Sequence, residues 1–474
     1  MTGDNFLSFF TNCKKARLRV EEKMQKAENI PNVKRGKGNF LKGAVWIAAG
    51  GFVAKLIGAV YRIPLTNLIG GYGLGLYQMV YPTYCLLLTV SATGIPSSIA
   101  KLTAERLGRG ESDMPLFRTA MRLFLLIGFF GSLLMCLLAP MLSKAQGSQA
   151  VLGGYYTLAP SVFLVSAISV FRGWFQGRGD MAPTAVSEIV EQGVKVGFGL
   201  LFAYLFQGQP EKAVVFLLLA VSLSELTALF LMTFLFRRVH APVELQNLGS
   251  PVRAKTVLKM SIPVTFNSIL LPLSSLLDSV LAPRLLGVYS ADAVTLFGLF
   301  SGGATTVINL PVSVCYGIAV ASVPAVADAV AKGVSCSALR KKIAFALGIT
   351  FAVGIPSALG LYFLAEPVAK IIFRSLAQEE LKTLIGLIRA FSVSALTLSC
   401  VQTTSACLTA QGKPQYGALS MLIALAVKTG LYIWWLQRPE ISVFGLVYAT
   451  NIAYFLAFLL NLLYNLKVSK KRKR

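Results

Sequence analysis

The chain has 474 residues, of which 55% are hydrophobic and only 14% are charged, and its mean hydropathy is +0.67. A soluble protein of this size could not bury so much apolar surface. The apolar residues also come in blocks long enough to cross about 30 Å of hydrocarbon. Seven cysteines without a CxxC pair and one histidine offer no metal site. We therefore expect no cofactor, no metal and no enzymatic activity.

Twelve apolar segments predict twelve membrane-spanning helices. Their approximate limits are 43–64, 74–100, 116–142, 150–172, 182–207, 212–236, 257–282, 293–325, 343–365, 384–408, 415–436 and 442–466. The connections between them are short, so we expect no inserted soluble domain.

The positions of the basic residues test this count. When the N-terminus is assigned to the cytoplasm, the cytoplasmic segments hold 33 of the 45 lysines and arginines, and the outer segments hold seven. Cytoplasmic loops of membrane proteins carry such an excess, so both termini are predicted to lie inside. The net charge of +25 is then mostly a topology signal that suits contact with anionic membrane lipids. We expect no nucleic-acid partner.

Three sequence landmarks recur at similar offsets. Pro96 and Pro324 are 228 residues apart, Gln176 and Gln411 are 235 apart, and Lys195 and Lys428 are 233 apart. The repeat predicts an all-α polytopic membrane protein of two six-helix lobes, related by an axis along the membrane normal. The lobes are expected at 43–238 and 257–466, joined by a cytoplasmic linker at 239–256. Basic cytoplasmic segments, 1–42 and 467–474, flank them.

Several ionisable residues lie inside predicted helices. Each of them raises the free energy of membrane insertion by roughly 2.5–3.5 kcal/mol. They include four bases (Lys55, Arg62, Lys195, Lys428) and four acids (Glu188, Glu191, Glu225, Asp278). The spacing of Glu188, Glu191 and Lys195 puts them on one helical face, so Glu191 can pair with Lys195. An equal number of acids and bases is also typical of buried ion pairs that only hold helices together. The functional alternative is a hydrated central cavity whose cations bind an anionic group such as a diphosphate.

A glycine-rich run, Gly70-Gly71-Tyr72-Gly73-Leu74-Gly75, faintly resembles a phosphate-binding loop. It joins two predicted spans, so we interpret it as a tight turn.

Several motifs resemble the stage V sporulation protein B family. They include Leu56-Ile57-Gly58, Tyr61-Arg62, Gly94-Ile95-Pro96, Phe171-Arg172-Gly173-Trp174-Phe175-Gln176-Gly177, Glu191-Gln192 and Val427-Lys428-Thr429-Gly430-Leu431. That family belongs with the MurJ-type lipid II flippases and polysaccharide exporters of the multidrug/oligosaccharidyl-lipid/polysaccharide (MOP) superfamily. The resemblance covers roughly residues 40–466, and many of these relatives have two helices more than the twelve expected here.

The resemblance implies two lobes around a cationic cavity with alternating access, and outward movement of an undecaprenyl-diphosphate-linked saccharide. It implies that Lys55 and Arg62 match the basic pair on the first helix of those flippases. We expect a monomer that contacts membrane lipids and couples to H+, Na+ or the membrane potential. The expected substrate-binding residues are Lys55, Arg62, Glu188, Glu191, Lys195 and Lys428, and the candidates for gating or coupling are Arg172, Glu225 and Asp278.

Three other functions stay open. A cation-coupled multidrug exporter of the same superfamily would have a cavity dominated by acids and aromatic residues. A membrane-embedded glycan polymerase or ligase would need a large outer loop, and every predicted outer loop is short. A scaffold that transports nothing is the third.

Overall fold

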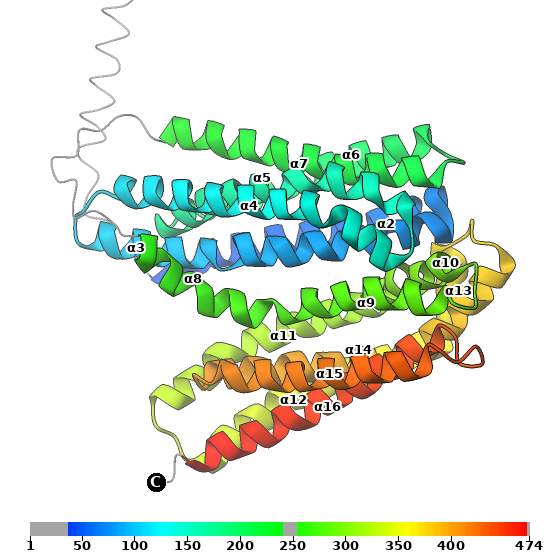
Figure 1. Cartoon of the computed structure of the whole chain (residues 1–474). Coiled ribbons are helices and arrows are strands. Elements are labelled where there is room, and N and C mark those ends of the chain that lie inside the picture. Colours follow the sequence, from blue (N-terminus) through cyan, green and yellow to red (C-terminus); the bar gives the residue numbers. More distant parts are fainter. Residues whose placement is uncertain (1–36, 240–253, 472–474) are drawn as a thin grey trace, which may run out of the picture.

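The computed structural model describes residues 37–239 and 254–471 of the chain, and every element in these ranges is helical (Figure 1). The first half contains α2 (Lys37–Leu88), η1 (Thr89–Thr93), α3 (Ile95–Gly108), α4 (Met114–Gln146), η2 (Gln149–Val151), α5 (Leu152–Gly177), α6 (Ala182–Leu205) and α7 (Pro210–Val239). The second contains α8 (Ala254–Ser268), α9 (Leu270–Leu286), α10 (Ala293–Gly298), η3 (Leu299–Ala304), α11 (Thr305–Ala331), α12 (Cys336–Phe363), α13 (Ala365–Ile372), α14 (Gln378–Ala410), α15 (Pro414–Trp435) and α16 (Phe444–Lys471).

Helix α2 is broken at Gly70. The backbone there has φ 69° and ψ −177°, a left-handed conformation that glycine adopts without a steric penalty. The break separates two helical arms, which lie on either side of the glycine-rich run. The turn predicted for this run is therefore confirmed.

Nine helical segments of the described ranges are long and apolar enough to cross a membrane. Helix α6 is not among them, because every stretch of sufficient length includes Glu188, Glu191 and Lys195. The all-helical class is confirmed, whereas the count of twelve crossings and the orientation of the termini stay predictions. Large apolar side chains such as Leu137, Phe230 and Phe345 are exposed on these helices, as expected for surfaces that face lipid.

The helices form two groups that follow the order of the chain (Figure 1). Helices α2 to α7 make one group, in which α5 packs against α4 and α7, and α6 packs against α2 and α7. Helices α11 to α16 make the other, in which α14 packs against α11, α12 and α16. Helix α9 runs between them (Figure 1) and contacts both α2 and α15. The residue limits predicted for the two lobes stay predictions.

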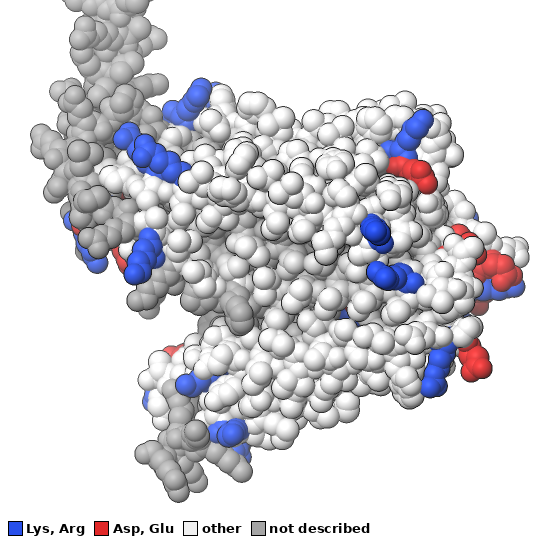
Figure 2. All heavy atoms as spheres, in the orientation of Figure 1, with Lys and Arg blue, Asp and Glu red and all other residues white. Residues whose placement is uncertain are grey.

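The two groups meet at one end of the molecule and diverge toward the other, where the chain reaches its C-terminus (Figure 1). On the face drawn in Figure 2, charged side chains gather toward the two ends, and a broad band of uncharged surface lies between them. That distribution suits a protein with its long axis across a bilayer. Most of the predicted basic segment 1–42 and of the linker 239–256 lies outside the described residues.

Three asparagines on α16 show how the second group is held together. Asn451 and Asn461 donate to the backbone carbonyls of Ala390 and Val401 on α14 at 2.9 and 3.4 Å. Asn465 accepts from Gln411 at 2.7 Å. In hydrocarbon an unsatisfied polar group is costly, so such side chains join helices.

Candidate functional site

A cavity of about 610 Å³ lies between the two groups of helices. One side is formed by α2 and α6, and the other by α9, η3 and α11. Its lining residues are Gly58, Tyr61, Arg62, Leu65, Leu74, Tyr77, Gln78, Tyr81, Pro82, Cys85, Lys195, Leu271, Pro272, Ser275, Ser301, Thr305, Thr306, Asn309, Leu310 and Ser313. The volume is within the range of about 300–1,000 Å³ that small-molecule sites occupy.

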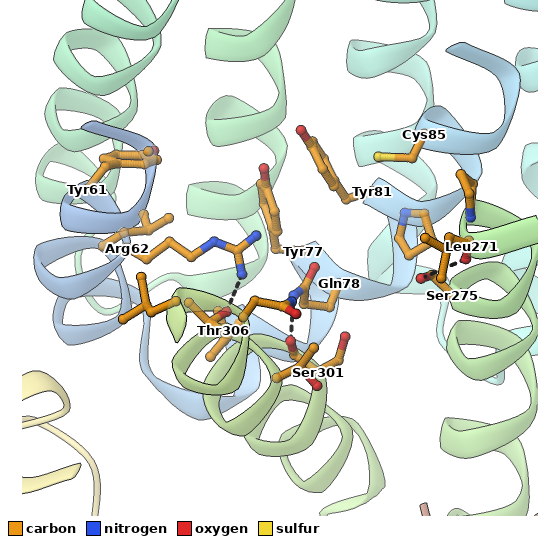
Figure 3. Close-up of a pocket in the computed structure, with 18 of the residues that line it drawn as sticks. Tyr61, Arg62, Tyr77, Gln78, Tyr81, Cys85, Leu271, Ser275, Ser301 and Thr306 are labelled. Carbon is orange, nitrogen blue, oxygen red and sulfur yellow. Dashed lines mark hydrogen bonds between the residues drawn. The ribbon is translucent and has the colours of Figure 1, made fainter. Parts of the chain in front are cut away.

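Arg62 joins the two sides of the cavity. Its Nη1 donates a hydrogen bond to the Thr306 hydroxyl at 2.5 Å, which connects α2 with α11. Figure 3 shows the guanidinium beside Tyr77, reaching toward Thr306. A planar guanidinium has five N–H donors, so this hydrogen bond leaves others available to an anionic ligand.

Lys195 supplies a second cation to the same cavity from α6. It lies within electrostatic range of Arg62, Glu191 and Glu225. Among the described residues that line the cavity, Arg62 and Lys195 are the charged ones, and none is acidic. The cavity therefore presents a positive field to whatever enters it.

Aromatic and polar side chains complete the walls. Tyr77 and Tyr81 stack on α2 with ring centroids 5.1 Å apart. Gln78 donates its amide N–H to the carbonyl of Ser301 at 3.0 Å, a second hydrogen bond between the two sides (Figure 3). Ser301 lies in η3, a π-helical turn of the kind that often marks functional sites. These groups suit a polar ligand with an apolar component.

A second cluster of charges lies beside the cavity and does not line it. Arg172 on α5 donates to Glu191 on α6 at 2.9 Å and to the Ser187 hydroxyl at 3.0 Å. Tyr84 donates to Oε1 of Glu225 at 3.1 Å, and that glutamate is buried. The sequence predicted a pair between Glu191 and Lys195. In the structure Glu191 forms its ion pair with Arg172 on the neighbouring helix, and its attraction to Lys195 acts over a longer range.

Lys428 is placed elsewhere. Its ammonium donates to Asp278 on α9 at 2.7 Å and to Ser274 at 2.9 Å, and it lies 5.2 Å from the ring centroid of Tyr432. The exposed fractions of the Lys428 and Asp278 side chains are only 5% and 14%. The structure does not bring Lys428 into the cavity. It forms a buried ion pair between α9 and α15. This agrees with the alternative that such charges form ion pairs which only hold helices together.

The two remaining predicted substrate-binding residues are Glu188 and Lys55. Glu188 is half-buried on α6 and does not line the cavity. Lys55 lies on the described backbone of α2, but its side chain is outside the described part of the structure.

The tyrosines and the polar face of η3 and α11 were not predicted from the sequence. Ser301, Thr305, Asn309 and Ser313 recur every fourth residue and all line the cavity. This period places them on one helical face. A polar stripe along an apolar helix is the signal that could have identified them.

The fold and the cavity define a multi-pass membrane protein with a polar chamber between two helical lobes, the architecture of a membrane transporter. Solved structures of membrane transporters have a similar fold. An inward-facing multidrug resistance MATE family transporter of the MOP superfamily aligns with a TM-score of 0.75 and 16% identity, over 89% of this chain and 95% of that one. A MOP superfamily transporter from Pyrococcus furiosus aligns with a TM-score of 0.63 and 17% identity, over 92% and 96%.

Residues 40–330 match the family described as polysaccharide biosynthesis protein. The chain belongs to this family and, with it, to the MOP exporter superfamily. It is similar to the stage V sporulation protein B of Bacillus subtilis (strain 168), with 25% identity over 90% of this chain and 83% of that protein. It is also similar to the lipid II flippase MurJ of the same organism, with 22% identity over 88% and 81%.

Proposed function

We propose that the protein is a flippase that moves an undecaprenyl-diphosphate-linked saccharide, a cell-wall or polysaccharide precursor, to the outer leaflet. The observation that supports this most is the sign of the charge in the cavity. Arg62 and Lys195 approach from two helices, and no acidic side chain of the described residues lines the chamber. A diphosphate carries roughly two or three negative charges and requires several Lys or Arg donors.

The arrangement of the two lobes suits alternating access. At the end where they meet, the glycine-rich run of α2 packs against α10: a Cβ added to Gly298 would lie 2.5 Å from the amide nitrogen of Gly75. We assign this closed end to the outer face, following the predicted topology. The saccharide–diphosphate head would enter from the cytoplasmic end, and separation of this seam would release it outside.

The remaining charges are assigned other roles. We propose that Lys55, on the same helix as Arg62, adds a third cation to the chamber. The buried carboxylate of Glu225 beside Lys195 is the candidate for coupling to H+ or Na+. The membrane potential is the alternative driving force, at about 2.3 kcal/mol per charge per 100 mV. The pair of Lys428 and Asp278 holds α15 against α9.

A cation-coupled multidrug exporter remains the main alternative, because the solved structures of similar fold include MATE transporters. An organic cation needs an anionic or neutral chamber, because like charges repel. Two lysine or arginine side chains in the lining oppose that cargo.

The test is a flipping assay in vesicles containing the purified protein. Fluorescent undecaprenyl-diphosphate saccharides, lipid II among them, would be followed as they become accessible on the opposite leaflet. We expect Arg62→Gln and Lys195→Gln to slow transport strongly. Lys101→Gln is the control, since this lysine is 63% exposed and forms only a surface pair with Glu105 at 3.8 Å. Unchanged flipping in both cavity variants, or efflux of an organic cation instead, would refute the proposal.

A further inference from the structure

Three arginines lie at one end of the first group of helices, outside the cavity. Arg118 and Arg122 are one turn apart near the start of α4, and Arg237 is near the end of α7. All three side chains are exposed. Figure 2 shows basic side chains at the left-hand ends of α4 and α7, the ends that the predicted topology places in the cytoplasm. We call these three residues the arginine cluster.

Two stacked aromatic rings bring the members of the cluster together. The rings of Phe117 on α4 and Phe236 on α7 have their centroids 4.6 Å apart, and both rings pack on α5. The two helices run in opposite directions, since the start of one meets the end of the other. With 3.6 residues per turn, the next residues, Arg118 and Arg237, therefore project on the same side of the pair, away from α5. Arg122 follows one turn later on that side.

The arginine cluster has no counter-ion among the described residues. Other arginines at this end do have acidic partners: Arg106 pairs with Glu111 at 3.3 Å, and Arg178 pairs with Asp113 at 3.0 Å. Adjacent like charges repel one another, so an anion bound between the three guanidinium groups would stabilise this surface. Guanidinium groups bind phosphate oxygens through paired N–H donors.

Exposed aromatic side chains continue from the cluster toward the middle of the spanning helices. Phe129 is seven residues from Arg122, and Phe230 is seven residues from Arg237. Their exposed fractions are 54% and 68%. Seven residues are about two turns, or about 10 Å along the helix, so each phenylalanine lies below its arginine on the same face. Both belong to segments apolar enough to span a membrane, where such side chains contact hydrocarbon.

We infer that the arginine cluster binds the headgroup of an anionic phospholipid of the inner leaflet, whose acyl chains cover Phe129 and Phe230. Charge complementarity selects the phosphate, and the apolar surface that continues from the arginines selects a molecule with acyl chains. A soluble phosphate shares the headgroup chemistry and leaves the two phenylalanines uncovered. The site lies outside the cavity, so the inference goes beyond the proposed function and does not depend on the cargo.

Native mass spectrometry of the purified full-length protein in an uncharged detergent tests the inference. The probes are phosphatidylglycerol and phosphatidylcholine with identical acyl chains, so they differ in headgroup charge alone. We expect saturable binding of phosphatidylglycerol, at least about fivefold tighter than binding of phosphatidylcholine. Each of Arg118→Gln, Arg122→Gln and Arg237→Gln should weaken phosphatidylglycerol binding by about fivefold, the contribution of one basic residue at an anionic membrane surface.

Arg238→Gln is the matched control. It removes the same charge from the neighbouring exposed residue, whose guanidinium lies 4.4 Å from the ring centroid of Phe234 instead of in the cluster. We expect it to leave phosphatidylglycerol binding unchanged. A thermal melt of each variant without added lipid shows that it is folded, and no loss of stability is expected, because each cluster variant relieves repulsion.

Four results would overturn the inference. Equal binding of the two lipids would show that charge does not select the ligand. Unchanged phosphatidylglycerol binding in the three cluster variants would place the lipid elsewhere, and an equal loss in Arg238→Gln would show that only net charge matters. Displacement of the lipid by an equal concentration of glycerol 3-phosphate or polyglutamate would identify the ligand as a soluble phosphate or an acidic chain.

Discussion

The substitution Gly298→Ala tests whether the closed end is a gate. A Cβ at this position would overlap the Gly71 carbonyl and lie 2.5 Å from the amide nitrogen of Gly75, 0.9 Å less than the 3.4 Å at which ordinary contact begins. The nearest obstacles are backbone atoms of the opposite lobe, so no side-chain rotation relieves the overlap. The lobes must separate at this seam to accommodate the methyl group.

The size of the effect follows from the cost of overpacking. Forcing extra atoms into a packed contact costs typically about 1–3 kcal/mol. If that cost falls on the closed state alone, the ratio of open to closed molecules rises by about 5–150-fold. Gly75→Ala should act in the same direction, because its Cβ would lie 2.8 Å from the carbonyl carbon of Val294.

The assay is a distance measurement between spin labels in a background without native cysteines. Labels at Lys212 on α7 and Asp292 before α10, both exposed, report the separation of the lobes at the closed end. We expect a longer distance population in Gly298→Ala. The control is Gly197→Ala on α6, where an added Cβ meets no atom within 4 Å. An unchanged distribution in Gly298→Ala, or an equal shift in Gly197→Ala, would refute the gate.

Three further predictions concern groups outside the cavity. Lys428→Met should lower the free energy of unfolding by about 3–5 kcal/mol, because it leaves Asp278 buried without its counter-ion; a thermal melt checks this, and recovery is expected when Asp278→Asn is added. Tyr84→Phe removes the hydrogen bond to Glu225 and should lower the free energy of unfolding by about 1–3 kcal/mol. An unchanged melting temperature would show that the Glu225 carboxyl group does not require this donor. Asn465→Leu removes two hydrogen bonds between α16 and the region of α14; it should lower the free energy of unfolding by about 0.6–2 kcal/mol, and limited proteolysis should detect loosening of α16 before the rest unfolds.

The fold was largely predictable because membrane helices leave strong local signals. Runs of apolar residues must be helical in hydrocarbon, since each backbone group has to be satisfied within its own segment. The turn at Gly70 was predictable for a local reason as well, because the glycine-rich run lies between two such segments. Which helices of one lobe contact those of the other was not predictable, since this depends on contacts between distant parts of the chain.

The site was predictable only in part. The sequence shows how deep in the membrane a charged residue lies. It does not show whether the side chain faces the cavity or a neighbouring helix. Arg62 and Lys195 were both identified as buried cations, and the structure places them in one chamber. Lys428 carried the same signal, yet its partner is Asp278, 150 residues earlier. Glu191 was expected to bind a residue of its own helix, and Arg172 on α5 binds it instead.

The most direct test of the central claim is equilibrium binding of inorganic pyrophosphate to the purified protein. The account predicts saturable binding that weakens by about tenfold or more, at least 1.4 kcal/mol, in both Arg62→Gln and Lys195→Gln, with Lys101→Gln unchanged. Equal affinity in the native protein and in both cavity variants would contradict it, because the anion would then be held somewhere other than between these two cations.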